Sequence, residues 1–157
     1  MAPSRSKPVG GVESVALYPT TAVVAALFSS EGCEIELSGT AIEVPLLEDA
    51  SYYTESTETT HGMTRISHLL HLVADRNDAT EWLTEELIER ASFEGFIAVI
   101  WLCSGRQILA GYSALFENEQ PLRLESLTSA SGCSPHDVPS VALRLIAHDT
   151  AFSPNIL

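Results

Sequence analysis

Lysine is almost absent from this 157-residue chain, in which Lys7 is the single example. Acidic residues outnumber lysine and arginine by 21 to 8, so the formal net charge is -13. Between residues 8 and 64 there is no lysine or arginine, whereas nine acidic residues fall there. A chain with this balance repels nucleic-acid phosphates and anionic lipid surfaces. We therefore expect neither specific nucleic-acid binding nor membrane binding.

Cysteine is also scarce, and Cys33, Cys103 and Cys133 have no spacing typical of a metal site. We expect buried free thiols in a reducing compartment. The apolar run at residues 22–28 is too short to span a bilayer and has no basic segment just ahead of it. The glycine pair at 10–11 lacks the lysine and helix of a phosphate-binding loop. The sequence therefore predicts no metal and no cofactor.

Hydrophobic residues make up 45% of the chain, which is enough for one domain with a core. We expect this domain to cover residues 12–149. Residues 1–11 contain two prolines and two glycines and are predicted to form a flexible N-terminal arm. Residues 150–157 are predicted to form a loose C-terminal tail.

One amphipathic helix is predicted at about residues 78–91. Asp78 is the expected N-cap, and Arg90 near the other end suits the helix dipole. Trp82 is expected to lie on the core-facing side rather than in a ligand site. The apolar side chains of this face repeat every four residues, at Ala79, Leu83, Leu87 and Ala91.

A strand and its return follow the helix. Between residues 96 and 103, apolar side chains occupy odd and even positions alike. This favours a strand covered on both faces, with the helix covering one of them. A turn at Ser104 and Gly105 leads into residues 106–112, which are predicted to run back antiparallel.

The remaining segments are mostly typical of strands. Residues 33–44 alternate apolar and acidic side chains around Ser38-Gly39 and predict a hairpin, whereas residues 22–28 suit either a short helix or a strand. Further strands are expected at 12–17, 63–73, 122–127 and 141–147. The sum predicts an α+β fold of mainly antiparallel β structure, a barrel or a sandwich with one flanking helix.

Residues 48–62 stand apart, because they are rich in threonine, serine and glutamate and contain little to bury. We interpret them as a functional or assembly loop. Tyrosine is enriched at protein interfaces. Our hypothesis for an assembly contact accordingly names four residues, Tyr52, Tyr53, Glu55 and Glu58.

Two groups of residues invite a chemical hypothesis. His68 and His71 lie in a predicted strand at an odd spacing, which points them to opposite faces and argues against one shared metal ion. Cys133, His136 and Asp137 are the parts of a cysteine nucleophile system. They crowd one loop, however, and such systems are normally assembled from distant segments. Catalysis is therefore not the leading expectation.

The order of these features resembles tail-tube structural proteins of bacteriophages and prophages. The resemblance covers residues 10–149 and is one of layout, without an invariant catalytic motif. It rests on a short arm ending in Gly10-Gly11-Val12, a polar loop ending at Gly62, a strand, the central helix, the Gly105-Arg106 hairpin, Gly111, PLRLESLTSASG and the late DVPSVALRL strand.

The resemblance implies a non-enzymatic subunit that assembles into hexameric rings, which stack into a tube or form its end. It also implies other tail proteins as partners, and localisation in the bacterial cytoplasm during assembly and then in the particle. An acidic lumen would let DNA slide without binding. Two alternatives from other classes stay open: a monomeric β-barrel that binds a ligand or peptide, and a cysteine-dependent hydrolase using Cys133 and His136.

Overall fold

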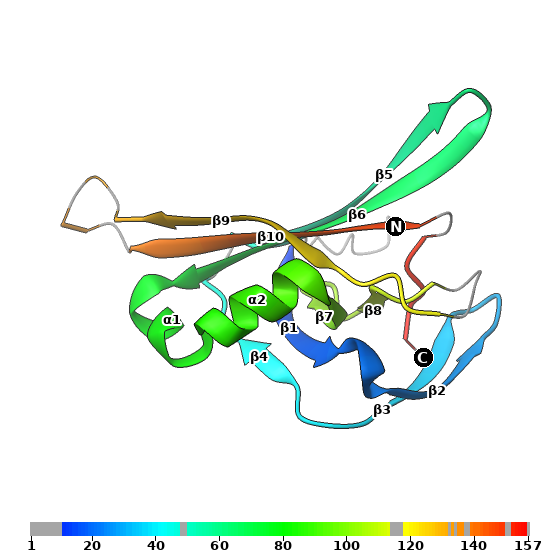
Figure 1. Cartoon of the computed structure of the whole chain (residues 1–157), viewed down its shortest axis with the longest axis horizontal. Coiled ribbons are helices and arrows are strands. Elements are labelled where there is room, and N and C mark those ends of the chain that lie inside the picture. Colours follow the sequence, from blue (N-terminus) through cyan, green and yellow to red (C-terminus); the bar gives the residue numbers. More distant parts are fainter. Residues whose placement is uncertain are drawn as a thin grey trace, which may run out of the picture.

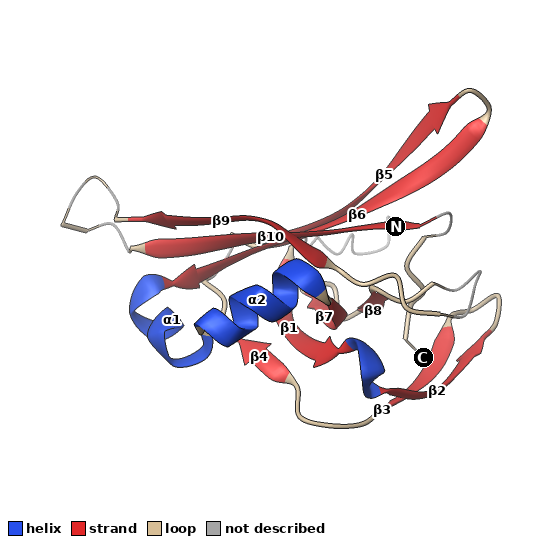
Figure 2. Ribbon diagram, viewed as in Figure 1, coloured by secondary structure: helices blue, strands red, loops and turns tan. Residues whose placement is uncertain are grey.

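The computed structural model describes residues 11–47, 50–113, 118–131, 133, 135–136, 139–149 and 152–156. Within these residues, ten strands form three sheets, accompanied by two short helices and one 3-10 turn (Figures 1 and 2). Every pair of neighbouring strands in the sheets is antiparallel. The predicted N-terminal arm lies outside the described residues, apart from Gly11.

The first sheet, here called the central sheet, has the order β4–β1–β7–β8. Its strands are β1 (Val12–Pro19), β4 (Ile42–Val44), β7 (Phe96–Leu102) and β8 (Gln107–Ala110). Phe96, Ala98 and Ile100 of β7 point into the main core, whereas Ile97 and Val99 point into a second core on the other side. The prediction of a strand covered on both faces is confirmed.

The second sheet, here called the long sheet, has the order β5–β6–β10–β9. Its strands are β5 (Tyr52–Thr60), β6 (Met63–Asp75), β9 (Arg123–Ala130) and β10 (Ser140–Asp149). Alternate residues of β10 are buried in the main core as predicted, namely Val141, Leu143, Leu145 and Ala147. Figure 1 shows the helices under this sheet and the β5–β6 hairpin running out beyond the rest. Neither four-stranded sheet closes on itself, so the α+β fold is a sandwich and not a barrel.

A two-stranded hairpin covers the other face of the central sheet. It consists of β2 (Val23–Phe28) and β3 (Cys33–Leu37), which follow the 3-10 turn η1 (Thr20–Ala22). The predicted hairpin around Ser38-Gly39 is therefore wrong, because β3 pairs with β2 whereas β4 pairs with β1. Two different cores separate these strands: Ile35 packs in the second core and Val44 in the main one.

The predicted helix of residues 78–91 is two helices, α1 (Arg76–Trp82) and α2 (Glu85–Phe93). Thr84 divides them, because its Oγ1 accepts a hydrogen bond of 3.1 Å from the Leu87 N–H and caps α2. At the start of α1, an Asp75 oxygen accepts from the Asn77 N–H at 2.9 Å, a role that the sequence had given to Asp78. Leu87 and Ala91 are buried as expected.

The interpretation of residues 48–62 as a loop is also wrong for the part that the structure describes. Tyr52–Thr60 form β5, which pairs with β6 along its whole length, and His61-Gly62 make the turn with positive φ at both residues. Threonine and tyrosine suit an extended backbone even where little is buried, which explains the strand. The tail differs from its expectation as well, because Asn155 and Ile156 are hydrogen-bonded to β3 and β8.

Candidate functional site

The four residues of the predicted assembly contact lie on two opposite faces of the long sheet. Because side chains alternate along β5, Tyr53 and Glu55 point inward, whereas Tyr52 and Glu58 lie on the outer face. The outer face is the one turned away from the helices and the central sheet (Figure 1). The structure therefore does not bring the four together, and each face has to be considered by itself.

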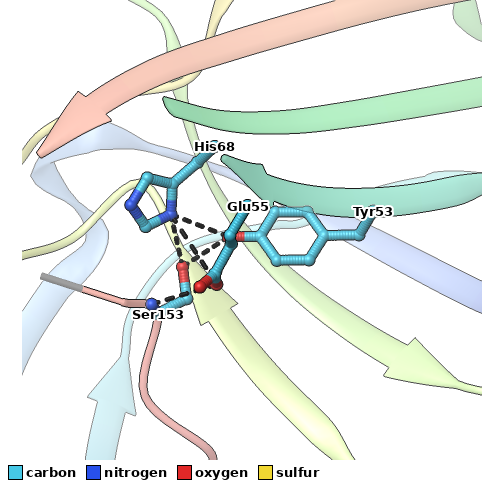
Figure 3. Close-up of polar contacts among 4 residues, drawn as sticks. All are labelled: Tyr53, Glu55, His68 and Ser153. Atoms are coloured by element: carbon cyan, nitrogen blue, oxygen red, sulfur yellow. Dashed lines mark hydrogen bonds and ion pairs between the residues drawn. The ribbon is translucent and has the colours of Figure 1, made fainter. Parts of the chain in front are cut away.

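On the inner side, Tyr53 belongs to a polar cluster with Glu55, His68 and Ser153 (Figure 3). The Tyr53 hydroxyl lies 2.9 Å from Glu55 Oε1, 2.8 Å from His68 Nδ1 and 2.6 Å from Ser153 Oγ. The Ser153 N–H donates to the same glutamate oxygen at 3.1 Å. The cluster thus fastens the segment after β10 to the base of the β5–β6 hairpin.

The geometry of this cluster fits a structural role better than a catalytic one. In a serine–histidine–acid triad, the serine and the acid approach opposite nitrogens of the imidazole. Here Ser153 Oγ, at 2.8 Å, and Glu55 Oε1, at 3.9 Å, both approach His68 Nδ1. Burial raises the pKa of Tyr53, and the Glu55 carboxylate raises it further, so the phenol stays protonated. We interpret the four side chains as a hydrogen-bonded clamp.

On the outer face, a row of side chains crosses three strands. The Tyr52 ring stacks on the His71 ring, with centroids 4.7 Å apart and an interplanar angle of 21°. His71 is paired in register with Arg144 of β10. Among the described residues, His71 Nδ1 and Arg144 Nε are buried atoms without a hydrogen-bond partner. Such atoms cost free energy until a partner is supplied, so this row is a candidate contact site.

Apolar side chains surround that row. Leu69 and Val73 of β6 and Ala142 and Ile146 of β10 are half-buried at positions that alternate with the buried core residues. Further along the hairpin, Glu58 forms an ion pair of 3.1 Å with Arg65, both side chains being more than half exposed. The described helices and the central sheet lie against the opposite face. The outer face therefore combines apolar, aromatic and arginine side chains, a composition typical of protein interfaces.

The two histidines follow the prediction, because His68 is buried on the inner face and His71 lies on the outer one. Among the described residues no group of three or more histidine, cysteine or acidic side chains is placed to hold a metal ion. In the β9–β10 connection, Cys133 and His136 are exposed, while Asp137 lies outside the described residues. The expectation of buried thiols holds for Cys33 and is wrong for Cys103 and Cys133, which are exposed.

Comparison of the chain with protein families, with curated proteins and with solved structures found no match. In the part of the chain that the structure describes, no helix has both the length and the apolar character needed to cross a membrane.

Proposed function

We propose that this protein is a non-enzymatic structural subunit that self-assembles through the outer face of the long sheet. The observation that carries the proposal is the row of Tyr52, His71 and Arg144, in which two buried polar atoms have no partner among the described residues. A second copy could supply acceptors for these atoms while covering Leu69 and Ile146. Burial of apolar area would then drive the association.

The proposed assembly is a ring of a phage-like tail, such as a hexamer, that stacks into a tube or closes its end. Edge strands support this architecture, because β5 and β9 both leave one side of their backbone unpaired by a described strand. A subunit with two free edges can extend its sheet in both directions. Other tail proteins would be its partners, in the cytoplasm of a bacterial host during assembly and in the particle afterwards.

Exposed carboxylates are also found away from the contact face. The outer face of the long sheet carries Arg65, its ion-pair partner Glu58 and Arg144, whereas further exposed carboxylates lie on β3 and along α2. An acidic lining past which DNA slides would therefore be built from the β2–β3 hairpin or the helices. Association through the outer face leaves those elements uncovered.

The test is absolute mass by light scattering over a concentration series, with electron microscopy of the same samples. The parent chain should form rings or a concentration-dependent oligomer. A Tyr52→Ala, Leu69→Thr variant should shift to the monomer, because it removes aromatic and apolar contact from the outer face. A parent that stays monomeric at every concentration contradicts the proposal.

The matched control changes two exposed apolar residues on other surfaces. Leu27, 70% exposed on β2, and Phe152, 59% exposed after β10, are replaced by threonine and alanine. This Leu27→Thr, Phe152→Ala variant should assemble like the parent. Equal loss of assembly in both variants would show a general effect of lowered hydrophobicity and would overturn the assignment to the outer face.

A further inference from the structure

An open groove separates α1 from the edge of the central sheet. It has a volume of about 710 Å³, and its lining residues come from β1, β4, α1 and β7 and from Pro45 just after β4. Its lining consists of Glu13, Ser14, Val15, Glu43, Val44, Pro45, Glu81, Trp82 and Trp101. Two aromatic side chains and three carboxylates therefore converge on one concave surface that lies apart from the outer face of the long sheet.

The chemistry of this lining matches a cation. Glu13, Glu43 and Glu81 are exposed, and within the described part of the chain none of them forms an ion pair with an arginine. Trp82 and Trp101 line the groove, and the faces of aromatic rings attract ammonium and guanidinium groups. Trp82 Nε1 is a buried donor without a hydrogen-bond partner in the described part of the chain. A ligand with a positive charge and a carbonyl oxygen would satisfy both features.

A peptide supplies that combination. β4 is the edge strand of the central sheet, so one side of its backbone is unpaired by any described strand. An extended peptide laid along this edge could pair with the backbone, while its lysine or arginine side chains reach the carboxylates and the tryptophan rings. Metal ions fit less well, because tryptophan offers no ligand atom.

We propose that the groove binds the N-terminal segment of a second copy of this chain, through Arg5 and Lys7. The other six basic residues are all arginines of the folded domain. Arg65 and Arg90 are in ion pairs and Arg106 and Arg123 in hydrogen bonds, while Arg76 begins α1 and Arg144 lies in β10 on the outer face of the long sheet. Arg5 and Lys7 are the two cations that precede the described fold. Ten residues before Gly11 can span about 33 Å when extended, enough to reach a neighbouring molecule. This contact does not require the outer face of the long sheet.

The experiment uses intrinsic fluorescence, because both tryptophans of the chain line the groove. The full-length Arg5→Gln, Lys7→Gln variant is titrated with a peptide of residues 2–10, which contains no tryptophan. A saturable change in emission is expected, and it should weaken as salt is added. A peptide with glutamine at both basic positions should produce no such change. An emission that stays constant during the titration overturns the proposal.

Charge-matched protein variants locate the binding. Replacing Glu13, Glu43 and Glu81 by glutamine should lower the affinity for the peptide about tenfold, because three favourable charge contacts are lost. The control replaces Glu34, Glu36 and Glu89, which are also exposed and lie outside the groove. Its affinity should stay within about twofold of the parent. An equal loss in the two variants would indicate unspecific attraction to an acidic protein and would overturn the assignment.

The same fluorescence measurement shows whether the groove is occupied by the N-terminal segment of a neighbouring copy or by that of its own chain. The emission of the natural chain should move toward the peptide-saturated value only as its concentration rises. An emission that already matches saturation at the lowest concentration would place each segment in its own groove and overturn the assignment to a second copy. Light scattering on these samples reports assembly through the outer face separately, so the two proposals can fail independently.

Discussion

Tyr52 of β5 stacks on His71 of β6, with ring centroids 4.7 Å apart. The same histidine is held against Arg144 on its other side by the register of β6 and β10. Burial lowers the pKa of His71, and the positive charge of Arg144 lowers it further. The imidazole is therefore neutral near pH 7, which allows it to stack on a phenol within a half-buried face.

Stability and assembly should both depend on the protonation of His71. Its pKa in the folded chain lies below the ordinary value of 6.5, so the unfolded chain binds more protons as the pH falls below 6.5. The free energy of unfolding should decrease from there and level off only below the pKa of the folded state. Urea unfolding of the parent between pH 7.5 and 5 should show a steeper loss than that of His71→Gln. Parallel pH profiles would contradict this assignment.

The Tyr53→Phe variant tests the clamp. Removing the hydroxyl leaves Glu55 and Ser153 with one hydrogen bond fewer in a mostly buried place, and it should lower the free energy of unfolding by about 1–3 kcal/mol. Tyr52→Phe is the matched control, because Tyr52 is 40% exposed and its contact to His71 is made by the ring. Urea unfolding measures both, and equal stability of the two variants would argue against the clamp.

A double Tyr52→Ala, Tyr53→Ala substitution should affect the fold as well as assembly. Because Tyr53 packs against the main core, the double variant should unfold at lower urea concentration than Tyr52→Ala alone. Circular dichroism during urea titration makes the comparison.

The three cysteines should separate into two classes. Cys103 and Cys133 are exposed, whereas Cys33 is fully buried, and burial raises the pKa of its thiol. A thiol reagent should label two residues in the native chain and the third only in denaturant, as read by mass spectrometry. Labelling of Cys133 at the rate of a small free thiol would count against the hydrolase alternative. A much faster reaction would favour it.

Gly95 and Gly111 should tolerate alanine less well than other glycines with positive φ. A Cβ atom would come within 2.7 Å of the Leu122 carbonyl oxygen at Gly95 and of the Phe96 carbonyl oxygen at Gly111. Each Gly→Ala change should therefore cost more than the roughly 1–2 kcal/mol of a left-handed backbone alone.

Gly39 and Gly105 provide the controls, because they share the positive φ and have open space around them. Alanine at Gly39 or Gly105 should incur only the backbone cost, and thermal unfolding compares all four variants. Equal losses of stability at the four positions would mean that the close contacts of Gly95 with Leu122 and of Gly111 with Phe96 of β7 are unimportant.

Local periodicity carried much of the fold prediction. In β7, apolar residues at both odd and even positions predicted a strand that is covered on both faces. In β10, the two-residue alternation predicted that Val141, Leu143 and Leu145 lie in the core. The same alternation separated His68 from His71. These predictions succeeded because side-chain direction follows directly from the backbone repeat. Tyr52 and Tyr53 obey the same repeat, but β5 contains so few apolar residues that no apolar alternation marks it as a strand.

Pairing between distant segments could not be read in this way. The hydroxyl of Ser153 reaches Tyr53, 100 residues earlier in the chain, and nothing in the local pattern of either residue signals that contact. The groove likewise joins Trp82 of a helix to Trp101 of a strand and to carboxylates from β1 and β4. Such sites exist only after the elements have packed.

The sequence by itself determined most of the strands other than β5 and β2, the helical region, the antiparallel α+β class and the acidic balance, because these follow from residue type and spacing along a few neighbouring positions. Only the tertiary structure decided which strands pair and which face of the long sheet is left open. It also decided that β3 and β4 lie in different sheets and pack against different cores. Those choices depend on the competition between burial of apolar surface and loop closure over the whole chain, and no short stretch contains that information.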